Sequence, residues 1–294
     1  MKILLFGKYG QLGWELQQTL ACLGQVIALD LPEVDFTKPG LLTQVIQEVD
    51  PELIINAVAY TNVDKAECEP EVARLINATS VGVIADAALH RKTPFIHFST
   101  DYVFNGAKGS PYAETDTPEP INVYGQTKLE GEQAIQQVGG ICLILRTSWV
   151  YSLRKGGFVN KVLEWSRTQK VIRVVDDQVG NPTWARMLAE ATAIIIAQGK
   201  DDPTGYLSDK AGLYHLAGAG FASRFLWSQE ILKNIGDKSY TSILEPAKST
   251  EFTTPAIRPL NSSLNCDLFE ATFKFMLPDW IIALEFLMSD KVMI

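Results

Sequence analysis

The sequence is poor in the residues that build disulfide frameworks and metal centres. Its 294 residues include four cysteines and three histidines. The cysteines form no C-x-x-C pair and no metal-ligand spacing, and the histidines do not cluster with them; they are Cys22, Cys68, Cys142 and Cys266. Isolated thiols in a chain of this length are typical of a reducing compartment. We therefore expect neither a disulfide framework nor a metal centre.

Long apolar runs and excess positive charge are also missing. No run approaches the roughly 18 apolar residues of a membrane-spanning helix, and the first apolar stretch ends at Gly7, too early for a signal peptide. The formal charge of −8 argues against a nucleic-acid surface, which needs a basic patch. We expect a cytoplasmic protein with no membrane or nucleic-acid partner. An anionic small substrate stays open, because a few local donors can outweigh a distant negative surface.

The chain does contain a regular alternation of short apolar runs and helical patterns. Strands rich in Ile, Leu and Val indicate a parallel sheet that helices cover on both faces. The alternation therefore predicts a doubly wound α/β fold of the Rossmann type. The expected strands are 2–6, 25–30, 52–59, 93–100 and 141–148, and the helices between them are 11–24, 38–49, 70–90 and 122–138.

The pattern loosens after Trp149. Further strands are predicted over 170–177 and 212–218, and a helix over 183–198. We expect a dinucleotide-binding domain and a mainly substrate-binding part that packs on the sheet, because no clear linker separates them. Their expected bounds are 1–150, with later strands of the sheet from about 170–220, and 151–294.

The first motif is a glycine-rich turn between the first strand and the first helix. Gly7, Gly10 and Gly13 have G-x-x-G-x-x-G spacing, not the G-x-G-x-x-G of the standard dinucleotide fingerprint. Such a turn lets the backbone approach a pyrophosphate at a helix N-terminus. Asp30 ends the second strand, where a carboxylate suits the ribose of NADH and repels the 2′-phosphate of NADPH. A tight turn with a solvated aspartate is the alternative, and Lys8 leaves the preference open.

The second motif ends the fourth strand, and the third opens the next helix. Ser99 and Thr100 are expected at the ligand crevice beyond the strand ends, although such a pair also caps loops. Tyr124 and Lys128 lie one helical turn apart and share a face. Lysine there favours the phenolate and lowers the tyrosine pKa, and it can bind a nicotinamide ribose. A hydroxyl that polarises a carbonyl completes a hydride-transfer site with Tyr124 as proton donor.

Two later residues have open interpretations. Trp149 follows the fifth strand, where it would form the floor under a sugar or base or pack as a core residue under the C-terminal segment. Arg258 lies in the segment RPLNSSLN with Asn261 and Ser262. Its guanidinium would grip a diphosphate or hold a loop.

The order of these motifs resembles the extended short-chain dehydrogenase/reductase superfamily. Within it, the chain is similar to the dTDP-4-dehydrorhamnose reductase family from Lys2 to about Trp280. The matching segments are GKYGQLGWEL, NAVAYTNVDKAE, INATSV, HFSTDYVF, NVYGQTKLEGE, LRTSWVY and RPLNSSLN. The resemblance implies NAD(P)H-dependent reduction of the C4 keto group of dTDP-4-dehydro-L-rhamnose, the last step of dTDP-L-rhamnose synthesis for cell-surface polysaccharide.

The resemblance also assigns roles to individual residues. Those matching the catalytic set are Thr100, Tyr124 and Lys128. Those matching cofactor positions are Gly7, Gly10, Gln11, Leu12, Gly13, Asp30, Asp35, Phe36, Ala59, Tyr60, Thr61 and Phe98, with Tyr124 and Lys128. Those matching substrate positions are Val63, Ser99, Thr100, Asp101, Trp149 and Arg258. Tyr60 departs from the family, in which some members have histidine.

Several points stay open at this stage. Family members are described as taking NADH or NADPH, and some as needing Mg²⁺, which only the resemblance supports because the sequence has no metal-ligand cluster. A regulatory subunit of the methionine adenosyltransferase type, on the same scaffold, and a sugar-nucleotide epimerase are alternatives. Intact Thr100, Tyr124 and Lys128 favour the reductase. The exact nucleotide, the deoxysugar and the oligomeric state are undetermined, a homodimer being one arrangement to test.

Overall fold

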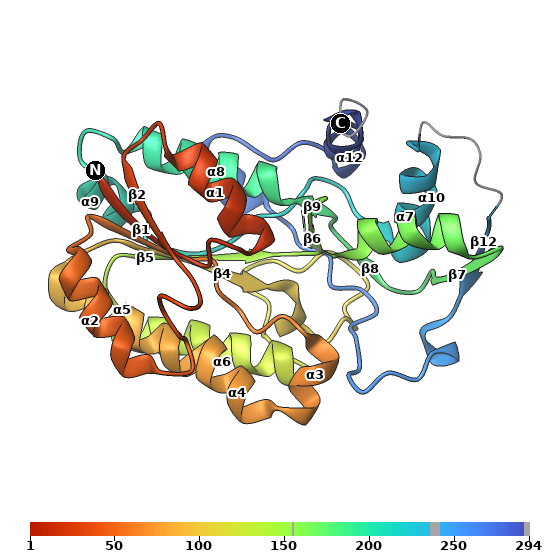
Figure 1. Ribbon diagram of the computed structural model, residues 1–294, viewed down its shortest axis with the longest axis horizontal. Helices are drawn as coiled ribbons and strands as arrows, with labels where there is room; N and C mark the ends of the chain where they lie inside the picture. The colour runs from red at the N-terminus through yellow and green to blue at the C-terminus, as the bar shows by residue number, and fades with distance from the viewer. Residues whose placement is uncertain (155, 236–241, 291–294) are drawn as a thin grey trace.

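The computed structural model describes residues 1–154, 156–235 and 242–290. Its centre is a six-stranded parallel sheet between two layers of helices (Figure 1). The predicted doubly wound α/β fold is therefore confirmed. In spatial order, the strands are β2 (Gln25–Leu29), β1 (Lys2–Phe6), β3 (Leu53–Asn56), β4 (Phe95–Thr100), β5 (Cys142–Thr147) and β10 (Gly212–His215).

Alternation along the strands divides the core into two halves. Ile3 and Leu5 point toward one helical layer, whereas Leu4 and Phe6 point toward the other, and all four are fully buried. Each such side chain contributes about 1.5–3 kcal/mol through burial. The first layer has α1 (Gln11–Leu20) and α8 (Ala185–Gln198); the second has α2 (Pro39–Val49), α5 (Ser80–Arg91) and α6 (Val123–Val138).

The helix predicted over 70–90 has three consecutive parts. These are α4 (Pro70–Arg74), the π-helical segment η1 (Leu75–Thr79) and α5. The stretch Pro70–Arg91 is long and apolar enough to cross a membrane by length and composition, but half of it is buried inside the protein. Since α5 packs against α2 and α6, this stretch is a core helix of the second layer. The short α3 (Val63–Cys68) precedes it.

The strands expected over about 170–220 divide between two sheets. β10 joins the central sheet, whereas β7 (Val171–Val175) pairs in parallel with β12 (Ile243–Ala247) at the far end of the molecule (Figure 1). The helix expected from residue 183 begins at Ala185, because Thr183–Trp184 forms β9 and pairs with β6 (Val150–Tyr151). β8 (Val179–Gly180) pairs with β11 (Ala222–Ser223).

The C-terminal part has a core of its own beside the carboxyl edge of the sheet. Trp227 and Tyr151 are fully buried there, and Trp280 closes the cluster from α12. The helices of this part are α7 (Phe158–Thr168), α10 (Arg224–Lys233) and α12 (Trp280–Asp290). Two further helices, α9 (Pro203–Asp209) and α11 (Asp267–Phe273), lie against the central sheet. Single 3₁₀ turns form η2 (Asp101–Val103) and η3 (Ser249–Glu251).

Candidate active site

The glycine-rich turn forms a cradle in which two positions, Gly7 and Gly13, require glycine. A Cβ at Gly13 would lie 1.9 Å from the carbonyl oxygen of Gly7, and Gly7 has a φ of +95°. Gly10 is the N-cap of α1, and no side chain caps the free N–H groups of that helix, which begins at Gln11 and Leu12. Free N–H groups and a positive helix end favour an anion. The cradle therefore fits a dinucleotide pyrophosphate.

Two carboxylates organise the loops where the adenosine is predicted to bind. The Asp30 carboxylate accepts hydrogen bonds from the backbone N–H groups of Tyr9 at 3.0 Å and Leu31 at 2.9 Å. Lys8, the residue that left the cofactor preference open, pairs with Glu33 at 2.6 Å between Nζ and Oε1. Lys8 is therefore already neutralised, which leaves the Asp30 charge unopposed by this lysine.

The other predicted adenosine residues follow β2. Asp35 accepts hydrogen bonds from the backbone N–H and the hydroxyl of Thr37, which lower the pKa of its carboxyl group. Phe36 is buried against Phe6, with ring centroids 5.4 Å apart. Its ring is thus part of the core, and its carbonyl oxygen accepts a hydrogen bond from the Ser80 hydroxyl at 2.6 Å. Phe98 is likewise a buried core residue of β4.

An asparagine that sequence reasoning left without a role organises the loop after β3. The side chain of Asn77, in η1, accepts from the Tyr60 N–H at 2.8 Å and donates to the Thr127 hydroxyl at 3.0 Å. It thereby joins the loop of Ala59, Tyr60 and Thr61 to α6. The Tyr60 hydroxyl donates to Glu69 at 2.7 Å. Asn77 is fully buried, and the signal available in the sequence was an asparagine directly after the apolar pair Leu75 and Ile76.

Ser99 and Thr100 do not point the same way. The Ser99 hydroxyl donates to Glu132 at 2.5 Å, inside a buried ion pair between Glu132 and Arg146. The expectation that the Ser99 hydroxyl faces the crevice is therefore wrong, because alternation along β4 turns it toward α6. The Thr100 hydroxyl accepts from the Tyr102 N–H and donates to Asp101, both at 3.2 Å. Thr100 is thus at the end of the sheet, as predicted.

Asp101 ties three segments together at the crevice. Its carboxylate accepts from Ser148, after β5, at 3.0 Å and from Ser262, in the C-terminal loop, at 2.5 Å. Burial raises the pKa of Asp101 to about 6, although the hydroxyl donors lower it in part. The motif RPLNSSLN therefore reaches the carboxyl end of β4 through Ser262.

Tyr124 and Lys128 occupy one face of α6, whose N-cap is Asn122. Burial raises the pKa of Tyr124, and the Thr100 hydroxyl only partly opposes this. The predicted lowering of the Tyr124 pKa by Lys128 is therefore wrong. The Lys128 Nζ is occupied elsewhere, donating to the Phe98 carbonyl oxygen at 2.7 Å and lying 3.1 Å from His97 Nε2.

A cavity of about 880 Å³ is lined mainly by residues of the C-terminal part, with Asn105 and Ile121 from the first half of the chain; Thr100, Tyr124 and Lys128 are not among its lining residues. Arg258 and Arg224 line it, and sequence reasoning missed Arg224 because no local pattern marks it. The Arg224 guanidinium lies 3.6 Å from the ring centre of Trp149, whose other neighbour is Trp227 at 5.6 Å. Burial lowers the pKa of Arg224. Trp149 thus packs on the C-terminal core while also positioning a desolvated cation.

Arg258 holds a loop, one of its two open interpretations. Its guanidinium pairs with Asp64 of α3 at 2.7 Å and donates to the Ala256 carbonyl. Burial alone would lower the Arg258 pKa, but the pairing raises it. Val63, the first residue of α3, is partly buried beside this pair. Arg258 therefore links α3 to the cavity wall.

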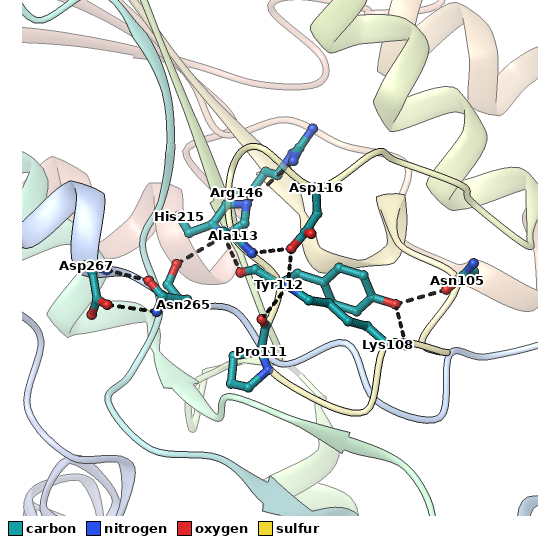
Figure 2. Close-up of polar contacts among 10 residues, drawn as sticks. All are labelled: Asn105, Lys108, Pro111, Tyr112, Ala113, Asp116, Arg146, His215, Asn265 and Asp267. Carbon is teal, nitrogen blue, oxygen red and sulfur yellow. Dashed lines mark hydrogen bonds and ion pairs between the residues drawn. The ribbon is translucent and has the colours of Figure 1, made fainter.

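The loop between η2 and α6 is anchored on the outer edge of the sheet (Figure 2). His215 of β10 donates through Nδ1 to the carbonyl oxygens of Tyr112 and Asn265, 3.0 and 3.1 Å away. Its Nε2 faces Arg146 Nη1 at 3.5 Å. Asp116 closes the loop by accepting from Lys108 and from the Ala113 N–H. This anchoring fixes the segment that follows the Thr100 motif.

No metal site accompanies these groups. Within residues 1–154, 156–235 and 242–290, no three or more His, Cys, Asp or Glu side chains form a group that could hold a metal ion. The expectation of Mg²⁺ therefore rests on the resemblance alone.

The parallel sheet, the glycine cradle and the Tyr124–Lys128 pair place this chain among extended short-chain dehydrogenase/reductase proteins. The family model described as the RmlD substrate binding domain matches residues 1–292. The chain is 42% identical to the dTDP-4-dehydrorhamnose reductase of Escherichia coli strain K12, over 99% of this chain and 98% of that protein. This chain belongs to the dTDP-4-dehydrorhamnose reductase family.

Solved structures agree with this assignment. A dTDP-4-dehydrorhamnose reductase from Clostridium acetobutylicum has a TM-score of 0.91 and 32% identity, covering all of both chains. One from Bacillus anthracis, solved in complex with NADP, has a TM-score of 0.88 and 30% identity, covering 98% of this chain and 99% of that one.

Proposed function

We propose that this chain reduces the C4 keto group of dTDP-4-dehydro-L-rhamnose with NAD(P)H, giving dTDP-L-rhamnose for cell-surface polysaccharide. The proposal is carried by the family match over residues 1–292, with Thr100, Tyr124 and Lys128 intact, together with a cavity of about 880 Å³ that Ile121, just before the helix of Tyr124, helps to line. Neither a regulatory subunit nor an epimerase has a comparable observation in its favour.

Tyr124 is the proton donor in this proposal. A bound nicotinamide cofactor supplies the hydride, and the substrate oxygen then becomes an alkoxide. Because an alcohol is a weaker acid than a phenol, Tyr124 can give up its proton even with a raised pKa. The Thr100 hydroxyl, held at the end of β4, orients the carbonyl oxygen. Lys128, one turn further along α6, orients the cofactor ribose.

The glycine cradle and the loops after β2 and β3 form the proposed cofactor side. Asp30 meets the adenosine ribose, and the Lys8–Glu33 pair leaves little positive charge for a 2′-phosphate. We expect both NADH and NADPH to be accepted, with NADPH disfavoured by Asp30. The division into a cofactor part, 1–150, and a substrate part, 151–294, is a proposal of the same kind. Cytoplasmic location and a homodimer stay predictions.

The cavity beyond the sheet edge is the proposed nucleotide-sugar site. Arg224 is desolvated and stacked on Trp149, so an anion gains more from it than from an exposed arginine. Arg224 and Arg258 therefore lie where the diphosphate is expected, and Trp149 orients Arg224. Val63 begins α3, whose Asp64 pairs with Arg258, and Asp101 begins η2 directly after β4.

The test is to vary Arg224 and follow steady-state kinetics with the nucleotide sugar. Arg224→Gln should raise KM for dTDP-4-dehydro-L-rhamnose at least about tenfold, the equivalent of roughly 1.4 kcal/mol, with NADPH affinity unchanged. Arg173→Gln is the matched control, because Arg173 also lines the cavity but is paired with Glu251. Equal effects of the two changes would refute the diphosphate role of Arg224.

A further inference from the structure

The carboxyl group of Asp101 lies between Thr100 and the C-terminal segment. Asp101 is buried, and its two oxygens have different neighbours. Oδ2 accepts hydrogen bonds from the hydroxyls of Ser148 at 3.0 Å and Ser262 at 2.5 Å. Oδ1 accepts from the hydroxyl of Thr100 at 3.2 Å. One oxygen is therefore tied to two flanking loops, and the other faces Thr100.

The direction of the Thr100 hydroxyl follows from these contacts. Its oxygen accepts a hydrogen bond from the Tyr102 N–H at 3.2 Å. A carboxylate has acceptors and no donor, so the single proton of Thr100 points at Oδ1 while Asp101 is ionised. A substrate carbonyl oxygen also accepts and cannot donate. An ionised Asp101 therefore competes with the carbonyl for the one proton that Thr100 offers.

A protonated Asp101 removes this competition. Its proton belongs on Oδ1, because two hydroxyl donors already face Oδ2. The Ser148 oxygen in turn accepts from the Asn181 N–H at 3.3 Å, which favours its hydroxyl as a donor to Asp101. With a proton on Oδ1, Asp101 donates to the Thr100 oxygen. The Thr100 proton is then free to turn toward the carbonyl.

We propose that Asp101 is a positioning residue for the reduction: its protonated form frees the Thr100 hydroxyl to donate to the substrate carbonyl, and its ionised form holds that hydroxyl back. The role of Thr100 rests on the proposed function, whereas the hydrogen bonds around Asp101 do not. Burial raises the pKa of Asp101 to about 6. At pH 7 the ionised form is thus about ten times more abundant than the protonated form.

The charged and titratable groups around Asp101 are consistent with this role. Arg224 of α10 and the three hydroxyl donors favour the ionised carboxylate, but burial outweighs them. Tyr102, on the same turn, and Tyr124, on α6, keep their protons because burial raises both pKa values. The Asp101 charge raises the pKa of Tyr124 further. Protonation of Asp101 therefore also makes Tyr124 a better acid, which favours a reduction that places negative charge on the substrate oxygen.

The first experiment measures kcat/KM for dTDP-4-dehydro-L-rhamnose between about pH 5 and pH 7, because kcat/KM reports groups of the free enzyme. Saturating NADH is used, since a 2′-phosphate titrates near pH 6. Burial lowers the pKa of His97 and His215, so both rings stay neutral, and Lys128 titrates above this range, at about 8. We expect kcat/KM to fall about tenfold as the pH rises, with a midpoint near 6. A value that is constant or rises would overturn the proposal.

Asp101→Asn holds the site in the donating form without a titration. Ser148 and Ser262 donate to the amide oxygen, which leaves the amide N–H₂ facing Thr100 as a permanent donor. We expect kcat/KM of this variant to be constant over the same range and, at pH 7, about three- to tenfold above wild type. A variant that keeps the wild-type pH dependence, or that reduces the substrate more slowly than wild type at pH 7, would refute the role of Asp101.

Ser262→Ala tests the contact from the C-terminal segment by moving the midpoint. The Ser262 hydrogen bond lowers the pKa of Asp101, so its loss should raise the midpoint of the kcat/KM profile by at least about half a pH unit, a threefold change. Ser263→Ala is the matched control, because the Ser263 hydroxyl donates to Asn261 at 2.7 Å. It should leave the midpoint unchanged. Equal midpoints in the two variants would contradict the link from Ser262 to Asp101.

A readout without substrate separates this inference from the proposed function. The C=O band of the protonated Asp101 carboxyl is followed by infrared difference spectroscopy of cofactor-free protein and assigned by its loss in Asp101→Asn. Its midpoint should match that of kcat/KM and should rise in Ser262→Ala. A band that titrates while kcat/KM stays constant would overturn the proposal. Protein that titrates at Asp101 but never oxidises NADH would instead contradict the reductase function itself.

Discussion

At the scale of single residues, Tyr124 is the proposed proton donor. Tyr124→Phe keeps the ring contact with Tyr102, whose centroid is 5.8 Å away, and removes only the hydroxyl. General acid catalysis contributes about 10²–10⁴-fold, so we expect turnover to fall by at least 100-fold with NADPH affinity unchanged. The measurement is kcat together with cofactor titration by fluorescence. A variant that retains more than about a tenth of wild-type activity would exclude Tyr124 as the proton donor.

Asp30 tests the cofactor preference at the same scale. Its carboxylate and a 2′-phosphate would lie within a few ångströms, a repulsion of about 1 kcal/mol even at the dielectric constant of water. We expect Asp30→Asn to shift the ratio of kcat/KM toward NADPH by about tenfold or less, roughly 1.4 kcal/mol. The ratio of kcat/KM for NADPH to kcat/KM for NADH is measured for the wild type and for the variant in one low-salt buffer. An unchanged ratio would place Asp30 away from the 2′ position.

Asp101 links protonation to stability. Its folded-state pKa of about 6 lies above the ordinary value, so the folded protein binds the proton more tightly than the unfolded chain. This contribution to stability is complete below about pH 4 and is lost as the pH rises to about 6, at about 1.4 kcal/mol per pH unit at most. Asp101→Asn removes it. The Tm of the variant relative to wild type should therefore increase from pH 4 to pH 7.

A control with the opposite sign is available at Asp116. Its ion pair with Lys108 lowers the pKa of that carboxyl group. The stabilisation is present above the unfolded pKa and is lost as the pH falls. Asp116→Asn should therefore cost more Tm at pH 7 than at pH 4, and the cost should be small because the pair is partly exposed. If both variants changed Tm in parallel, the buried-proton explanation of Asp101 would fail.

At the scale of elements, the close packing of α6 on η1 positions the catalytic helix. A Cβ at Gly131 would lie 2.2 Å from the carbonyl oxygen of Asn77. We expect Gly131→Ala to destabilise the protein by about 1–3 kcal/mol, despite the better helix propensity of alanine. Gly40→Ala in α2 is the control, because nothing lies within 4 Å of the added Cβ, and it should be neutral or stabilising by up to about 1 kcal/mol. Urea unfolding of both measures the difference, and equal values would contradict the packing argument.

The elements of the first half could be predicted because their pattern is local. The apolar runs of β1, β3 and β4 are each buried on both faces, and that signature needs no knowledge of partners. The side of β4 to which the Ser99 hydroxyl points could also have been derived. Residues two apart in a strand share a face, so Ser99 had to point to the same side as His97 and to the opposite side from Thr100. The alternation does not show which groups lie on that side of the strand. They are Glu132 of α6 and Arg146 of β5, which belong to two other elements.

The second half shows the opposite case. β7 and β12 are separated by the whole of α8 and α10, so their pairing depends on contacts that no short window contains. The role of Arg224 was unpredictable for the same reason. Its guanidinium contacts the rings of Trp149 and Phe158, which are both far away in sequence. Motifs tied to a strand end, such as Thr100, were predictable, whereas residues that depend on long-range packing were not.

At the scale of the whole molecule, the proposed reaction draws on both cores at once. The sheet holds the glycine cradle and the Tyr124 helix, and the C-terminal part supplies Arg224 and the far wall of the cavity. Ser262 joins the two through Asp101. Binding energy from the nucleotide can therefore orient a sugar that the catalytic residues alone would hold weakly.

The most direct measurement is NADPH and NADH oxidation by the purified chain with dTDP-4-dehydro-L-rhamnose, followed at the absorbance of the reduced nicotinamide. We predict turnover with both cofactors, formation of dTDP-L-rhamnose, and its loss in Tyr124→Phe. Absence of turnover in folded wild-type protein that still binds the cofactor would contradict the reductase function and favour a non-catalytic role.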